Sequence, residues 1–176
     1  AQLFSKINHV VNITIATSGW HSERVEKQVV EILKNCPQTK ITVDLSIDGL
    51  ENLHDAIRGK EGSFDHTVET GHRLAPLRKY YNNFHLCINT TISSFNQHQL
   101  IKLYEWIKKE FNPTVFNSYL TRGEPRDQTS LDYDLQPYIE LSEAMERDVV
   151  NGKIHGYNMM RDVLYAKDKI SRDLIT

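Results

Sequence analysis

Two kinds of hydrophobic pattern alternate along this chain. Short runs rich in β-branched residues are typical of strands, and they occur at 10–16, 41–47, 85–92 and 114–120. Between them, apolar residues recur every three or four positions, which is the spacing of one helix face. The sequence therefore predicts an α/β fold in which parallel strands alternate with helices through right-handed crossovers.

Capping residues and prolines predict where these helices begin and end. Ser22 and Asn96 are predicted N-caps, and Gln99, three positions after Asn96, resembles the second member of a capping box. Prolines end or kink the helices at positions 37, 76 and 113. Beyond residue 130 the pattern predicts two more helical segments, separated by the pair Asn151-Gly152.

Four strand–helix units are too few for a closed eight-strand barrel, which needs about 250 residues. We expect a partial (β/α) barrel arc over residues 1–130, with parallel strands and outer helices, and a C-terminal helical extension over 131–176. No element precedes the first strand to cover its edge, and a bare parallel edge is a liability. We therefore expect self-association, or pairing with the missing half of the barrel.

Composition narrows the functional classes. The 176 residues carry a net charge of −2, which gives no argument for a nucleic-acid or anionic-membrane partner. No apolar run approaches the roughly 20 residues that span a bilayer. The two cysteines, Cys36 and Cys87, fit neither a disulfide framework nor a zinc site, and the histidines show no metal spacing. We expect a cytoplasmic protein with reduced thiols and no metal site of its own.

The second predicted strand ends in the sequence Ser46-Ile47-Asp48-Gly49. A buried strand that ends in Ser46 and Asp48 is how α/β enzymes place polar groups at the mouth of a parallel sheet. Asp-Gly pairs are also common turn formers, so Asp48-Gly49 is equally consistent with a plain turn.

This region resembles the middle of the radical S-adenosylmethionine (radical SAM) enzymes, and most closely the branch that carries a cysteine-rich SPASM-type domain after the barrel. The resemblance begins at Ser46-Ile47-Asp48-Gly49 and continues through His54-Asp55, Arg58-Gly59 and Gly62-Ser63-Phe64-Asp65. Further segments match in the same order: Thr17-Ser18-Gly19, Ile88-Asn89-Thr90-Thr91-Ile92, Asn96 and Arg122-Gly123-Glu124-Pro125-Arg126-Asp127.

The resemblance implies a six-stranded (β/α) barrel, of which this chain would contain strands three to six. Enzymes of this family cleave S-adenosylmethionine (AdoMet) at a [4Fe–4S] cluster to abstract hydrogen from a substrate. By resemblance, the expected cofactor contacts are Ser46, Thr17, Ser18, Asn89, Thr91 and Asp48. The expected substrate contacts are Asn117, Tyr119 and Arg122.

Several of these residues have a structural interpretation beside the functional one. Asp48 would equally stabilise its own turn by bonding to backbone amides. His54, Asp55 and Arg58 recur in the family, but a salt-linked brace of the Ser46–Asp48 turn is favoured over acid–base catalysis, so we assign no catalytic residue. Arg122, with Arg126 and Asp127, would clamp an anionic substrate or form solvated surface.

The sequence also departs from the family. The Cys-x3-Cys-x2-Cys loop that holds the cluster is missing, and two cysteines cannot supply three ligands. A Gly-Gly-Glu-Pro segment after the second barrel strand is missing too, because Gly123-Glu124-Pro125 follows the last strand of this chain. We therefore expect a fragment of a longer enzyme that is inactive alone and holds neither AdoMet nor the cluster by itself.

The substrate is expected to be a peptide or a small molecule, and the sequence does not identify it. One alternative is a non-catalytic interaction module that retains the barrel arc. Another is an unrelated (β/α) enzyme acting on sugars or phosphates, which the absence of a glycine-rich phosphate loop disfavours.

Overall fold

The computed structural model describes residues 1, 3–5 and 9–152 of the chain. The strands are β1 (Asn12–Thr17), β2 (Lys40–Ser46), β3 (Phe84–Ile92) and β4 (Val115–Leu120). The α-helices are α2 (Ser22–Asn35), α3 (Asn52–Arg58), α4 (Ser63–Leu74), α5 (Leu100–Phe111) and α6 (Gln136–Val150), and 3₁₀ turns cover Ala75–Lys79, Gln97–Gln99 and Gln128–Leu131. The last predicted helix, near 157–170, lies outside the described residues.

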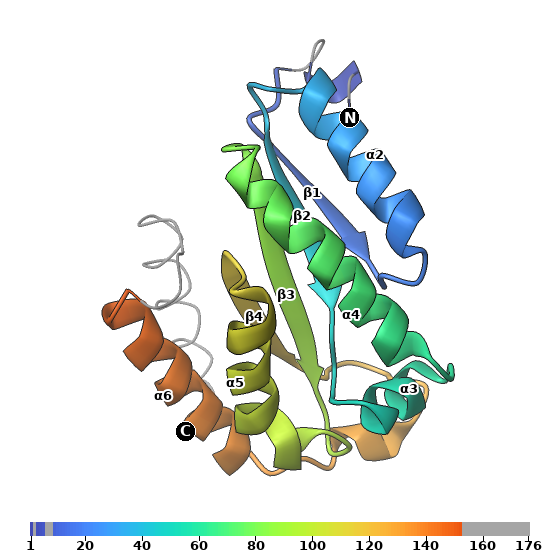
Figure 1. Cartoon of the computed structure of the whole chain (residues 1–176). Coiled ribbons are helices and arrows are strands. Elements are labelled where there is room, and N and C mark those ends of the chain that lie inside the picture. The colour runs from blue at the N-terminus through green and yellow to red at the C-terminus, as the bar shows by residue number, and fades with distance from the viewer. Residues whose placement is uncertain (2, 6–8, 153–176) are drawn as a thin grey trace.

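The four strands form one sheet in the order β1-β2-β3-β4, and every pair is parallel. Helices α2, α4, α5 and α6 lie on one face of this sheet, while α3 lies at the carboxyl ends of the strands (Figure 1). The prediction of an α/β fold with parallel strands and outer helices is confirmed.

The two faces of the sheet differ in polarity because side chains alternate along each strand. On the helix side, Ile41, Val43 and Leu45 of β2 are fully buried. The register pairs Ile41 with Phe84 and Leu45 with Ile88, so β3 continues the same apolar layer. The opposite face carries most of the polar residues of β2, among them Thr42, Asp44 and Ser46.

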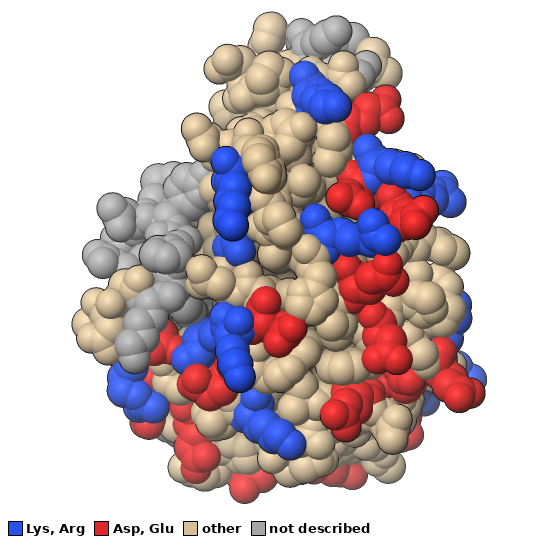
Figure 2. All heavy atoms as spheres, in the orientation of Figure 1, with Lys and Arg blue, Asp and Glu red and all other residues tan. Residues whose placement is uncertain are grey.

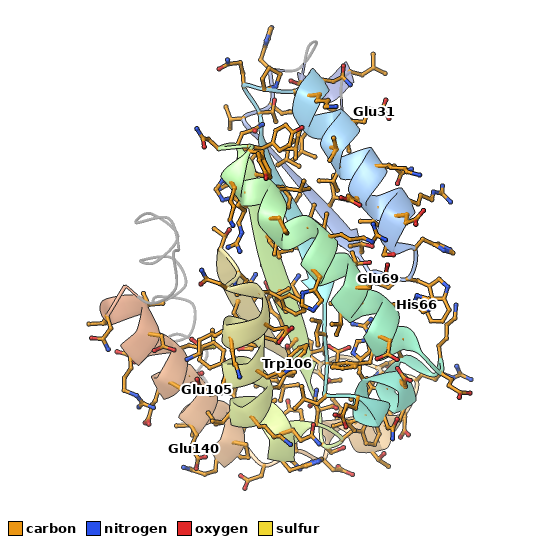
Figure 3. The ribbon with its side chains drawn as sticks, in the orientation of Figure 1. Glu31, His66, Glu69, Glu105, Trp106 and Glu140 are labelled. Atoms are coloured by element: carbon orange, nitrogen blue, oxygen red, sulfur yellow. The ribbon has the colours of Figure 1, made fainter. Side chains whose placement is uncertain are left out.

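Helices α4 and α5 approach each other at a glycine. A Cβ on Gly71 would lie 2.5 Å from Cε1 of Phe111, so only glycine fits at this position of α4. Trp106 lies on the side of α5 that faces α4 (Figure 3), and its ring packs 5.4 Å from those of Phe64 and Phe111. The aromatic layer fixes α4, which carries several site contacts, against the rest of the fold.

Charged side chains link α2 to α4 on the outside of the molecule. Arg73 of α4 pairs with Glu26 of α2 at 3.0 Å and with Glu69 of its own helix at 3.0 Å. Acidic and basic side chains are interspersed over this helical face (Figure 2), as in a solvated surface. Among the described residues, no helix has both the length and the apolar character needed to cross a bilayer.

The predicted caps are wrong in detail. Ser22 is the first residue of α2, but no capping bond is made by a side chain there. Asn96 does not cap α5, because a 3₁₀ turn follows it and the α-helix begins only at Leu100. Its side-chain amide makes long-range hydrogen bonds instead of capping the helix. Pro76 ends α4 as expected, by opening the 3₁₀ turn at 75–79.

Helix α6 packs against α5 through a buried polar contact. The Tyr104 hydroxyl donates to Oδ2 of Asp148 at 3.1 Å, and Lys108 pairs with the same carboxylate. Leu141 and Met145 of α6 join the hydrophobic core that the sheet forms with the other helices. The proposed division at residue 130 stays a prediction, and α6 shares the core of the barrel arc.

Candidate functional site

A row of polar side chains crosses the face of the sheet opposite the helices. The register pairs Ser46 of β2 with Asn89 of β3, and Asn89 with Asn117 of β4, so the three side chains point the same way at one level. Nδ2 of Asn117 donates to Oδ1 of Asn89 at 3.1 Å and lies 3.2 Å from Sγ of Cys87. We call Ser46, Asn89 and Asn117 the polar row; all three are partly exposed.

The next level of this face lies two residues nearer the carboxyl ends. Thr91 pairs with Tyr119, and both side chains are exposed. The face taken by Asn117 and Tyr119 could not be decided from the sequence, and the register places both on the side of the polar row. Arg122 lies in the exposed loop after β4.

Two predicted contacts at the end of β1 lie apart from the row. Thr17 pairs with Leu45, so it lies on the helix side of the sheet, and its Oγ1 accepts from the Gly19 N–H at 3.1 Å. Ser18 is exposed, and its carbonyl oxygen accepts from Thr67 at 2.7 Å. The structure does not bring Thr17 together with Ser46, and cofactor contact by either residue stays a prediction.

Helix α4 holds this β1 turn in place. Buried hydroxyls of Thr67 and Thr70 donate to the carbonyl oxygens of Ser18 and Gly19, the latter at 2.6 Å. Gly19 has φ +76, and a Cβ there would lie 2.8 Å from Leu45 Cδ1. Sequence reasoning missed both threonines, because no local signal distinguishes a buried threonine from an exposed one.

Further out, the ring of His66 extends from α4 toward the loop after β1 (Figure 3). Its centroid lies 4.3 Å from that of Trp20, and Nζ of Lys60 lies 3.2 Å from the centroid of the same indole. These contacts close the outer side of the β1 turn.

Asp48 is a brace at the end of β2. Only 3% of the residue is exposed, its Oδ1 accepts from the Thr91 N–H at 2.8 Å, and its Oδ2 lies 2.6 Å from Nη2 of Arg58. Burial raises the pKa of the carboxyl, while the Arg58 charge and the two bonds oppose that rise. Both oxygens are engaged within the protein, which is the geometry that a turn-stabilising side chain requires.

His54 reinforces the same turn as a neutral ring. It is fully buried, and its Nδ1 accepts from the Asp48 N–H at 3.1 Å, so the proton belongs on Nε2, which lies 3.4 Å from Oγ of Ser63. Burial, followed by the Arg58 charge, lowers the pKa of His54 to about 4. An imidazole held in this way acts as a structural link rather than as an acid–base group.

Asp55 fixes the start of α4. Its two carboxylate oxygens accept from the backbone N–H groups of Gly62 at 2.6 Å and Phe64 at 2.7 Å. The Phe64 N–H bond is the main cause that lowers the pKa of this carboxyl. His54, Asp55 and Arg58 thus join α3 to its neighbours, as the brace interpretation predicts.

A groove of about 960 Å³ lies beside Thr91, between α3 and the loop after β4. Its walls combine apolar residues with Arg58, whose side chain is 32% exposed, and with Arg126. Ser130 is 7% exposed, and its Oγ has no hydrogen-bond partner among the described residues. The lining also includes Leu53, Ala56, Ile57, Gly59, Ser93, Phe95, Thr121, Asp127 and Gln128.

Sequence comparison finds two curated relatives. The sporulation killing factor maturation protein SkfB of Bacillus subtilis (strain 168) is 28% identical over 53% of this chain and 20% of its own length. An AdoMet-dependent heme synthase of Methanosarcina barkeri (strain Fusaro / DSM 804) is 29% identical over 70% of this chain and 34% of its own length. This chain is related to the radical SAM superfamily.

Solved structures match the chain at the level of the fold. Native anSMEcpe, with bound AdoMet and a Cp18Cys peptide, matches with a TM-score of 0.53 at 21% identity, over 81% of this chain and 39% of that one. A histidine-tagged form of the same protein with bound AdoMet gives a TM-score of 0.51. No family model matches the chain. The chain spans about a fifth to two fifths of the radical SAM proteins that it matches.

The two radical SAM cofactors fit this chain differently. A [4Fe–4S] cluster does not fit, because Cys36 lies at the end of α2 and Cys87 in β3, both are buried, and no group of three metal-binding side chains occurs among the described residues. AdoMet has polar groups that the described residues can match. The polar row offers partly exposed hydroxyl and amide groups on one face of the sheet, and the groove beside Thr91 adds apolar lining together with Arg58 and Arg126.

Proposed function

We propose that this chain forms part of the AdoMet-binding barrel of a radical SAM enzyme and contributes one side of the cofactor site. The observation that carries the proposal is the alignment of Ser46, Asn89 and Asn117 at one level of the sheet. Parallel sheets place their binding groups at the carboxyl ends of the strands, where side chains from several strands converge on one ligand.

The groups of AdoMet match the two parts of the site. Its ribose hydroxyls and its methionyl ammonium and carboxylate need short donors and acceptors, which the polar row provides. Its adenine needs an apolar wall, which the groove provides through Ile57 and Phe95. Thr91 borders the groove and belongs to the same strand face as Asn89, so the two parts are continuous.

AdoMet and the reduced cluster, when bound, supply reductive cleavage of the sulfonium and hydrogen abstraction from a substrate. The chain's own task in that reaction is to bind and orient AdoMet. Cluster ligands would come from elsewhere, because this sequence contains only two cysteines. We propose that the chain alone is therefore inactive, and that the short coverage of its relatives reflects membership in a larger enzyme.

Nuclear magnetic resonance at millimolar AdoMet tests the binding site. The chain should bind too weakly for a stoichiometric complex, because it contacts the ligand from one side, yet amide shifts should localise to Ser46, Asn89 and Asn117. Asn89→Leu should weaken binding about tenfold, or about 1.4 kcal/mol. Asn12→Leu, at the amino end of the same sheet, should bind as wild type. Shifts spread evenly over both ends, or no shifts, would contradict the proposal.

Anaerobic reconstitution with iron and sulfide tests the cluster separately. The chain should take up no [4Fe–4S] cluster and show none of its visible absorbance, because its two thiols are buried in different elements. A relative that contains the cysteine triplet is the positive control. Stable cluster absorbance on this chain would show that the proposed division of labour is wrong.

A further inference from the structure

We infer that Asn96 is a positioning residue that clamps the carboxyl ends of β2 and β3 together and thereby sets the spacing of the AdoMet-facing side chains. The part that concerns AdoMet rests on the proposed function. Asn96 is fully buried and cannot contact a ligand. It therefore acts through its neighbours.

The amide of Asn96 joins three backbone groups from two strand ends. Its Nδ2 donates to the carbonyl oxygens of Asp48 and Thr91, each at 2.7 Å. Its Oδ1 accepts from the Ser93 N–H at 2.8 Å. Both donor hydrogens and the acceptor of the side chain are therefore satisfied, as a buried amide requires.

The clamp lies where the sheet itself ends. The last residues paired between β2 and β3 are Ser46 and Asn89, followed by one further bond from the Ile47 N–H to the Asn89 carbonyl oxygen. Beyond that point the strands are tied by side chains. Thr90 donates to the Ile47 carbonyl oxygen at 2.6 Å, Asp48 accepts from the Thr91 N–H, and Asn96 completes the set.

The position of this clamp links it to both parts of the proposed site. Thr91 and Ser93, which it holds from within, line the groove beside α3. Asp48, which it holds on the other strand, comes two residues after Ser46 of the polar row. Loss of the clamp should let the two strand ends separate, so that the polar row and the groove no longer fit one ligand.

Asn83 provides a matched control at the opposite end of the sheet. Its Nδ2 also donates to two carbonyl oxygens, those of Cys36 at 3.1 Å and Thr39 at 2.9 Å. An Asn→Ala change at position 83 therefore also removes a pair of side-chain hydrogen bonds, but from the amino ends of the strands. Any effect that follows from general destabilisation should appear in both variants.

The experiment compares Asn96→Ala with Asn83→Ala in the whole chain by amide hydrogen exchange and by AdoMet-induced shifts. For Asn96→Ala, exchange at Thr91 and Ser93 should accelerate about tenfold or more, since a lost buried bond is worth about 1 kcal/mol or more. Shifts at Ser46 and Asn89 should shrink. Asn83→Ala should leave both unchanged. Asn96→Asp keeps the size and the acceptor of the side chain but loses both of its hydrogen-bond donations. It replaces the alanine variant in the experiment if that variant does not fold.

Unchanged exchange at Thr91 and Ser93 in both Asn96 variants would overturn the inference. Equal loss of AdoMet shifts in Asn83→Ala would overturn it too, because the effect would then be one of stability alone. If wild type shows no AdoMet shifts at all, the proposed function fails, and the exchange comparison still decides whether Asn96 positions the two strand ends.

Discussion

Replacing Asp48 with alanine should lower the free energy of unfolding by about 3 kcal/mol, at the lower end of the range for breaking a buried ion pair. The carboxylate side chain is 5% exposed and pairs with Arg58, whose side chain is 32% exposed. The change leaves the Arg58 guanidinium without this partner and the Thr91 N–H without its acceptor. Urea denaturation at pH 7 measures the loss.

Asp48→Asn separates the contribution of the Arg58 ion pair from that of the Thr91 hydrogen bond. The asparagine oxygen can still accept from the Thr91 N–H, but its NH2 group takes the place of Oδ2 and cannot accept from Arg58. The Arg58 contact is therefore lost and the Thr91 bond is kept, and the expected destabilisation is about 2 kcal/mol. Asp44→Asn is the control, because Asp44 lies in the same strand and is partly exposed on the polar face. If Asp48→Ala lowers the free energy of unfolding no more than Asp44→Asn does, the Asp48 brace contributes nothing to stability.

The same variants separate the two functions that the sequence allows for Asp48. A cofactor contact would lose AdoMet-induced shifts on amidation while keeping stability, whereas a brace loses stability first. The geometry favours the brace, since both carboxylate oxygens already have protein donors. The cofactor-binding assignment of Asp48 remains a prediction for this experiment to decide.

The fold could be predicted from the sequence because its signals are local. The β-branched runs gave all four strands, and their alternation with helical periodicity predicted the parallel sheet. Prolines marked helix ends correctly, as Pro76 shows. Ser46 and Asn89 could be placed together because strand ends in a parallel sheet meet at one edge.

The rest of the site could not be predicted because its contacts are long-range. Thr67 and Thr70 each bond a residue about 50 positions away, and nothing in their local sequence distinguishes them from surface threonines. Asn96 resembles a helix cap because asparagine is a common cap, and only the nearby carbonyl oxygen of Asp48 diverts its amide. The face that Thr17 takes follows from its pairing with Leu45, and this pairing is a long-range contact that the local sequence does not contain.

Lowering the pH from 7 to 5 should cost the protein about 2 kcal/mol of stability through His54 alone. The buried ring has a pKa of about 4 in the folded protein, against an ordinary histidine pKa of 6.5. Between these values the unfolded chain binds a proton that the folded protein does not, so stability falls as the pH drops. His85, whose pKa is also lowered to about 4 by burial, should add to the loss in the same direction.

Chemical denaturation at a series of pH values, with His54→Asn beside wild type, measures this contribution. The asparagine oxygen can take the place of Nδ1 as acceptor for the Asp48 N–H but does not titrate in this range. Its stability should therefore fall less steeply between pH 6.5 and 5 than that of wild type.

Equal slopes for wild type and His54→Asn would show that the folded protein accommodates the protonated ring. The neutral link between α3 and the β2 turn would then be wrong, and His54 would regain the acid–base role that its burial argues against. A shallower slope in the variant places His54 with Asp48 and Asn96 in the set that holds the strand ends. Mild acid should then loosen the proposed AdoMet face before the core unfolds, because this set lies at the edge of the sheet.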